Sequence, residues 1–234
     1  MTQRMTITWC AMTTIALATL ASPAAAQVPP SAAEVAQFGA LHAAAHRGDP
    51  QRLAAALAAG AAINGRDRHG RTAVHVATFA RQRDAIRALV KAGADLSLLE
   101  NDRYDAVTIA AVADDEATLA LLLELGASAK LTTSRYDGTA LIAAAHLGHD
   151  GVVRQLIKAG APLDHVNNLH WTATIEAVVL GDGGPRHQAT LKALVDAGAN
   201  LALTDRSGKT ALDLARSRGF DAMVRILEAA TPRR

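Results

Sequence analysis

A seven-residue pattern recurs six times along this chain at nearly constant spacing. Successive copies start 33, 33, 34, 33 and 38 residues apart, at Gly39, Thr72, Asp105, Thr139, Thr172 and Thr210. A second marker keeps the same period, because a Gly-Ala pair closes an apolar stretch at Gly60, Gly93, Gly126, Gly160 and Gly198. A period near 33 residues is typical of a stack of similar supersecondary units, each packed on its neighbours.

Two copies carry the fullest form of the motif. Thr72-Ala-Val-His-Val-Ala follows Asp67 and Gly70, and Thr210-Ala-Leu-Asp-Leu-Ala follows Asp205 and Gly208. This pattern resembles the ankyrin repeat, D-x-x-G-x-T-P-L-H-x-A-A followed by an apolar helix ending L-L-x-x-G-A, and the resemblance covers 39–230. Ala stands at the family's Pro position in every copy, which keeps helix propensity. The resemblance implies an all-α solenoid of about six helix–turn–helix units with short β-hairpin or turn connections.

The second copy shows how one unit should fold. Gly70 can adopt positive φ in a turn, and the Thr72 hydroxyl can cap a first helix over 73–80. A second helix should start at Asp84 and end at Gly93 in a left-handed cap. Helices of eight to ten residues are unstable alone, so each unit must bury its apolar face on its neighbours.

The chain divides into four segments by this reasoning. Arg4, an apolar stretch and the A-x-A site Ala24-Ala25-Ala26 indicate a secretory signal peptide at 1–26, with an uncleaved anchor as the alternative. A capping segment follows at 27–38, where Ser31 and Glu34 form a capping box that should start a longer helix toward His46. The repeat domain, 39–230, has units near 39–67, 68–100, 101–133, 134–167, 168–205 and 206–230, and 231–234 form a frayed tail.

Charge and cysteine content limit the cellular compartments and the classes of partner to be expected. The single cysteine, Cys10, lies in the signal segment, so the mature chain can form neither a disulfide nor a thiolate metal site. A cysteine-free exported chain suits the bacterial periplasm. Charges are nearly balanced and dispersed, which gives no electrostatic footprint for nucleic acid or an anionic membrane.

Aromatic and charged residues gather at the expected hairpin tips. The triplet Arg-Tyr-Asp occurs in two consecutive units and His-Trp in the next, which gives the candidate contact residues Arg103, Tyr104, Asp105, Arg135, Tyr136, Asp137, His170 and Trp171. Tyr, Trp and Arg dominate interface energies, so we predict a stripe that binds a protein partner. The alternative is that the rings pack on neighbouring turns and that Arg–Asp pairs stiffen the hairpins.

The fifth unit departs from the pattern at two places. Five extra residues make a predicted projecting loop at 181–187, whose Arg186 and His187 are further contact candidates, although a neutral insertion explains it equally well. Glu176 occupies a position that is apolar in the other copies and should be buried. A buried carboxylate needs a partner, so we expect a structural strut to Arg186 or His187.

The histidines have a structural explanation. His42 and His75 stand at the family's His position, where the resemblance implies that the ring bonds backbone and links neighbouring units. The pairs His42/His46 and His146/His149 have spacings that could hold a metal, but no carboxylate of a zinc-hydrolase motif accompanies them. We expect no metal and no cofactor.

The function that the resemblance favours is non-catalytic. Ankyrin repeat proteins mostly bind proteins, and we expect a monomer that binds one through its hairpin tips and concave groove. The alternatives are an immunity-type inhibitor of a toxin that acts in the periplasm, an accessory protein in envelope or oxidative-stress defence, and a self-associating structural protein. The chain has no G-x-S-x-G, no H-E-x-x-H and no cysteine nucleophile, which argues against an enzyme.

Overall fold

The computed structural model describes residues 27–230 of the 234-residue chain. Within that range the chain forms α-helices joined by turns, with no named strand. The helices are α1 (Ala32–Val35), α2 (Ala40–Arg47), α3 (Pro50–Ala58), α4 (Ala73–Phe79), α5 (Arg83–Lys91), α6 (Ala106–Val112), α7 (Glu116–Glu124), α8 (Ala140–Leu147), α9 (Asp150–Lys158), α10 (Ala173–Val179), α11 (Pro185–Asp196), α12 (Ala211–Ser217) and α13 (Asp221–Ala230). Isolated β-bridges at Thr133–Gly138 and Thr204–Thr210 are the hairpin pairing that these turns retain.

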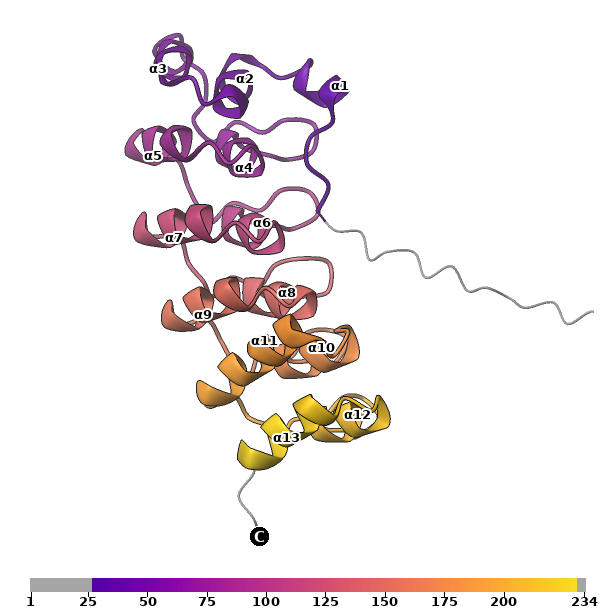
Figure 1. The fold of residues 1–234 in the computed structure, drawn as a ribbon. Helices are drawn as coiled ribbons and strands as arrows, with labels where there is room; N and C mark the ends of the chain where they lie inside the picture. The colour runs from indigo at the N-terminus through magenta and orange to yellow at the C-terminus, as the bar shows by residue number, and fades with distance from the viewer. Residues whose placement is uncertain (1–26, 231–234) are drawn as a thin grey trace, which may run out of the picture.

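Six helix pairs, from α2/α3 to α12/α13, lie one after another in a row (Figure 1). The first helices α2, α4, α6, α8, α10 and α12 pack on each other in one layer, and the second helices α3, α5, α7, α9, α11 and α13 form the other layer. The short helix α1 lies beside α2 at one end. The predicted all-α solenoid is confirmed. The predicted signal peptide, 1–26, and the tail, 231–234, lie outside the described residues.

The core runs between the two layers along the whole row. The first helices contribute mostly small residues, such as Ala44, Ala77 and Ala144, which are fully buried and let the backbones approach. The second helices contribute larger ones, such as Leu89 and Leu156. This division follows the sequence pattern, because the motif places alanine at helical spacing on the inward face of each first helix.

The ends of the second helices follow the glycine marker. Ala92 is the C-cap of α5, and the next residue, Gly93, has φ 93°, a conformation that costs a glycine little. The helix limits of this unit agree with the prediction within two residues. None of the helices in 27–230 is long and apolar enough to cross a membrane.

The prediction of one long N-terminal helix toward His46 is wrong. The capping box between Ser31 and Glu34 forms, but α1 ends at Val35 and α2 starts afresh after Gly39, whose backbone is extended. Gly39, the first residue of the first copy, therefore takes the N-cap place that Thr72 has in the second copy. Phe38 fills the break, with its ring centroid 5.9 Å from that of His42.

The predicted projecting loop at 181–187 is also wrong in extent. Pro185 is the first residue of α11, so Arg186 and His187 lie in the first turn of that helix. Proline suits this position because its missing N–H would have no helical partner there. The extra residues thus lengthen a helix to 12 residues, where α9 has 9, and leave a short link between α10 and α11.

Candidate partner-binding surface

Each turn between repeats is stiffened by one polar side chain. The Asp67 carboxylate accepts from the N–H groups of His69 and Arg71 at 2.8 and 2.9 Å. Asn167 Oδ1 accepts in the same way from Leu169 and Trp171, both at 3.0 Å. Side chains that accept from the backbone two and four residues on hold a turn in one conformation.

Hydrogen bonds also join each turn to the next along the row. Backbone N–H groups of Asn101, Ser134 and Asn168 donate to the preceding turn, at 3.0 Å to His69 O, 2.8 Å to Arg103 O and 2.9 Å to Tyr136 O. We call the four linked turns, 68–71, 101–104, 134–137 and 168–171, the ridge. Because successive turns are bonded to each other, the ridge is a continuous surface with fixed spacing.

Crossed ion pairs decorate the centre of the ridge. Arg103 Nη1 lies 2.8 Å from Asp137 Oδ1, and Arg135 Nη2 lies 2.8 Å from Asp102 Oδ1. Both pairs join neighbouring repeats, and half to two thirds of each side chain is exposed. Asp102 was missed by sequence reasoning, since it precedes the repeated triplet. The ring of Tyr136 lies in the same turn as Arg135 and is 49% exposed.

The other predicted contact residues differ in accessibility. Tyr104 is half-buried, and this burial raises the pKa of its phenol. Trp171 is half-buried against the core of the last two repeats, while His170 beside it is exposed. Asp105 is 1% exposed and caps α6 by accepting from Thr108 N at 2.8 Å. The ridge therefore exposes one large ring rather than three.

An exposed apolar residue extends the surface around Tyr136. Val166, in the turn that follows α9, is 42% exposed. The turn that follows Val166 is hydrogen-bonded to the turn of Tyr136, because Asn168 N donates to Tyr136 O. Sequence reasoning missed Val166, since a single aliphatic residue in a turn has no motif. Val166 thus lies two residues before the ridge turn 168–171, which is bonded to the turn of Tyr136.

The lengthened helix α11 reaches back over two repeats. Arg186 Nη2 lies 2.7 Å from Asp114 Oδ2, which follows α6 two repeats earlier. His187 Nε2 is 3.0 Å from His146 O, and its Nδ1 is 2.8 Å from Asp182 Oδ1. Contacts in a solenoid are usually limited to the adjacent repeat, so the Arg186–Asp114 pair reaches beyond the usual range, whereas the His187 bonds stay within its own and the adjacent repeat.

Glu176 is buried as predicted, but its predicted partners are wrong. The side chain is only 5% exposed, and Oε1 accepts from Asn167 Nδ2 at 2.8 Å. The nearest basic atom is His146 Nδ1, 3.8 Å from Oε2. Arg186 and His187 cannot serve because the first turn of α11 directs them to Asp114 and His146 O. Burial raises the pKa of the Glu176 carboxyl to about 7.

The histidines at the family position link repeats. His42 Nε2 is 2.9 Å from Arg71 O, and His75 Nε2 is 3.0 Å from Leu98 O. His75 Nδ1 accepts from Thr72 N at 3.0 Å, so its other nitrogen is the donor. Burial lowers the pKa of His75 to about 4, which keeps the ring neutral. Residues 27–230 bring together no group of three or more His, Cys, Asp or Glu side chains able to hold a metal.

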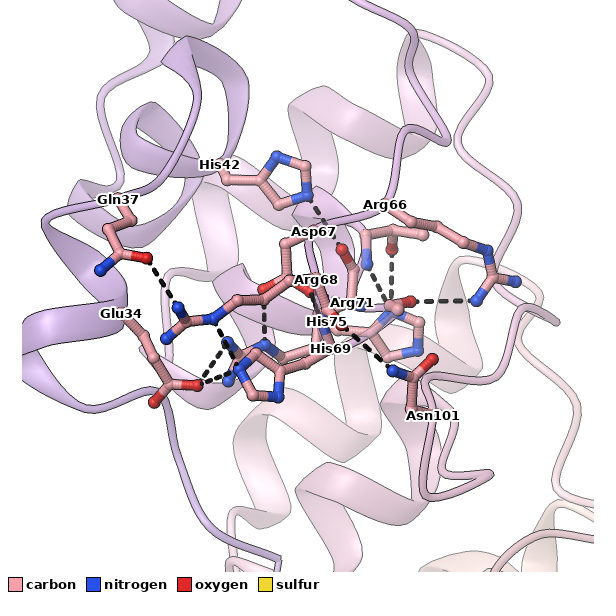
Figure 2. A network of polar contacts seen from close by, with 12 residues as sticks. Glu34, Gln37, His42, Arg66, Asp67, Arg68, His69, Arg71, His75 and Asn101 are labelled. Carbon is pink, nitrogen blue, oxygen red and sulfur yellow. Dashed lines mark hydrogen bonds and ion pairs between the residues drawn. The ribbon is translucent and has the colours of Figure 1, made fainter.

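A polar network fastens α1 to the first turn of the ridge (Figure 2). The buried Arg71 guanidinium lies 2.7 Å from Asp67 Oδ2 and 3.1 Å from Glu34 Oε1. His69 Nε2 is 2.6 Å from the same Glu34 oxygen. The segment 27–38 thus covers the first repeat. At this end of the ridge, the polar side chains of the turn hold α1 in place.

Comparisons with known proteins agree with this architecture. A family model described as ankyrin repeats (3 copies) matches 27–100 and 107–205. The ankyrin repeat protein YahD of Escherichia coli K12 is 36% identical over 188 residues, which is 80% of this chain and 93% of that protein.

Solved structures show the same likeness. An ankyrin repeat domain from Acinetobacter baumannii AYE is 41% identical with a TM-score of 0.76, covering 81% of this chain and 96% of that one. The ankyrin repeat protein EF0377 is 32% identical with a TM-score of 0.75 and the same coverage. A chain from the complex of the Bdellovibrio bacteriovorus endopeptidase Bd0816 with immunity protein Bd3460 is 22% identical, with a TM-score of 0.65 over 83% of this chain and 99% of that one, a likeness of fold alone.

Proposed function

Because the chain belongs to the ankyrin repeat family, whose repeats mediate protein–protein binding, we propose that it is a non-catalytic module that binds one protein partner through the ridge and the adjoining face of the first helices. The observation that carries this proposal is the exposed Tyr136 ring, whose chain neighbours Arg135 and Asp137 each belong to one of the two crossed Arg–Asp pairs. Tyr and Arg are the residue types that most often dominate binding energy.

The ridge is also organised before binding. Its turns are held by internal side-chain bonds and joined to each other by backbone bonds. A surface that is already ordered loses less conformational entropy when a partner binds. This rigidity supports a protein partner that matches the spacing of the turns.

The proposed location is the bacterial periplasm. It rests on the sequence features of 1–26 and on the lack of cysteine after Cys10. Expression of the full chain in a Gram-negative host should give a periplasmic protein that begins at Gln27, identified by intact-mass spectrometry. Ala24→Asp should block cleavage, since small residues are required at that position. A cytoplasmic chain of unprocessed mass would contradict the proposal.

Within this proposal the partner has two candidate classes. One is a toxin that acts in the periplasm, which the chain would inhibit as an immunity protein. The other is an exported enzyme or complex in envelope or oxidative-stress defence. Capture from periplasmic extract with photo-crosslinking at position 136, followed by mass spectrometry, separates these classes by the identity of the bound protein.

The Tyr136→Ala variant tests the surface itself. We expect its affinity for the captured partner to fall roughly tenfold or more, as for a central aromatic contact residue. The Arg135→Ala variant should weaken binding less, since the pair with Asp102 is half-exposed. Lys192→Ala is the matched control, because it breaks an exposed pair with Asp196 on α11, away from the ridge. Equal affinity of parent and Tyr136→Ala, measured by calorimetry, would refute the ridge as the binding surface.

A further inference from the structure

Glu176 differs from the other buried acids in what surrounds it. Asp67 lies against the Arg71 guanidinium, and Asp105 caps the N-terminus of α6. Glu176 lies in the first turn of α10, but its own N–H already donates to Thr172 O, and its carboxylate accepts from Asn167 rather than from a free N–H group of that helix. Among residues 27–230, no Arg or Lys is paired with it. Within the same residues, its second oxygen, Oε2, is paired with no Arg or Lys and accepts no hydrogen bond. The basic atom beside it is His146 Nδ1, at 3.8 Å.

The Oε2 atom faces the neighbouring helix α8, which carries His146. Helices α8 and α10 pack side by side, and Ala143 holds the same motif position in α8 that Glu176 holds in α10. The side chain of His146, one turn after Ala143, is 29% exposed. Ala143 is small and half-buried, as the alanine of the first copy is small, whereas the second and third copies have Val76 and Ile109 there. We take the side of His146 as the way from solvent to Oε2, because this side chain is partly exposed and lies 3.8 Å from that oxygen.

Apolar side chains follow Glu176 along the chain. Val179 and Leu180 follow Glu176 by three and four residues, so they lie on the same side of α10. Leu180 is 42% exposed, and Leu147 of α8 is half-buried. A carboxylate at the base of an apolar opening matches a side chain with an aliphatic stem and a cationic head.

We propose that Glu176 is the anchor for a basic side chain of the bound protein, which enters beside His146 and places its cationic group on Glu176 Oε2. This inference rests on the proposed function and names the chemistry of the partner at one point of its contact. The cation supplies the positively charged partner that the buried carboxylate lacks in the free protein. Asn167 holds Oε1, so the carboxyl is oriented before the partner arrives.

Binding should be linked to protons. The raised pKa of Glu176 means that the carboxyl is partly protonated near neutral pH, and a bound cation favours its ionised form. The titratable groups near Glu176 are His146 and two further histidines beside it, His187 and His149. Burial, together with those two rings, lowers the pKa of His146, so it does not supply the missing charge. Affinity should therefore rise with pH as Glu176 ionises.

The test uses three capped tripeptides, acetyl-Ala-X-Ala-amide with X as arginine, lysine or norleucine. In protein labelled with ¹³C at the glutamate carboxyl, the arginine or lysine peptide should move the titration midpoint of Glu176 to lower pH. The comparison of these two peptides identifies the preferred cation, and norleucine should have no effect. Glu176→Gln keeps the bond to Asn167, and its affinity for the cationic peptide should be roughly tenfold lower.

An unchanged Glu176 midpoint with both cationic peptides would refute the anchor. Equal peptide affinity in parent and Glu176→Gln would refute it as well. The Tyr136→Ala variant separates this idea from the proposed function, since it should lose the protein partner but keep the peptide response. If the partner is lost in Tyr136→Ala while Glu176 never responds, the binding module stands and the anchor is wrong.

Discussion

Replacing Arg71 by Met should destabilise the N-terminal half of the repeat domain by about 3–5 kcal/mol. The Arg71 side chain is 5% exposed and faces two carboxylates, those of Asp67 and Glu34, whose side chains are 11% and 16% exposed (Figure 2). Methionine fills similar space but leaves both acids without their cation. Removing one partner of a buried ion pair leaves a buried charge uncompensated, which costs more than the pair contributes.

A neighbouring arginine provides the control for this change. Arg68 lies in the same turn and bonds Gln37 Oε1 at 2.7 Å, but it is exposed. Arg68→Met should change the free energy of unfolding by less than about 1 kcal/mol, because an exposed polar contact contributes little. Urea unfolding followed by circular dichroism gives both values. Equal losses in the two variants would show that burial of Arg71 is not the cause.

The same network fixes one pH dependence. Bonds from Ser31 to the Glu34 carboxylate, followed by the charge of Arg71, lower the pKa of Glu34 to about 2, below the 4.5 of the free side chain. A lowered folded pKa gives stability that is present above the unfolded pKa and is lost as pH falls toward the folded one. Attachment of α1 should therefore weaken between about pH 4.5 and 2. Arg71→Met should keep part of this dependence, since Ser31 still bonds Glu34.

Sequence periodicity was sufficient to predict the backbone of the repeats. The spacing of Thr72 and Gly93 predicts where helices begin and end, because caps are local and depend on residues within one turn. The link from His75 to the next repeat was also predictable, as it follows from the motif that the family shares. The break before α2 was not, although Gly39 starts the first copy of the motif, because the capping box of Ser31 and Glu34 suggested one helix running through it.

Contacts between repeats were harder to predict than the helices. The partner of Glu176 is Asn167, nine residues earlier, whereas the sequence pointed to the insertion. The insertion extends α11 rather than a loop, so Arg186 turns toward Asp114, two repeats away. Exposure of the ridge side chains depends on the same details. Asp105 belongs to the first copy of the Arg-Tyr-Asp triplet and Tyr136 to the second. Asp105 caps a helix, whereas Tyr136 faces solvent.

Asn167 shows how one residue can be required by another in a different element. In two other turns the position holds an aspartate, Asp67 or Asp205, whose carboxylate accepts from two backbone N–H groups. Asn167 Oδ1 makes the same two bonds, and its Nδ2 is left to donate to Glu176. An aspartate would keep the turn but place a carboxylate oxygen against the buried acid. The amide is therefore explained by Glu176, and not by the turn.

The Asn167→Asp variant should consequently lose about 3 kcal/mol of stability at pH 8 and much less at pH 5. At low pH the two carboxyls can share a proton, while at high pH two like charges would lie in a buried site. The sign follows from linkage, because the folded state would hold a proton that the unfolded chain has released, so stability falls as pH rises. Urea unfolding at the two pH values measures this difference.

The double variant Asn167→Asp with Glu176→Gln should recover most of the lost stability and remove its pH dependence. The amide introduced at position 176 would donate to the new aspartate, which reverses the direction of the original bond while keeping its geometry. Glu176→Gln alone should be more stable than the parent at pH 8 and similar to it near pH 4.5, because it removes a carboxyl whose folded pKa is raised from 4.5 to about 7. An Asn167→Asp protein as stable as the parent at pH 8, or one that the second substitution fails to rescue, would show that the two side chains are not energetically coupled.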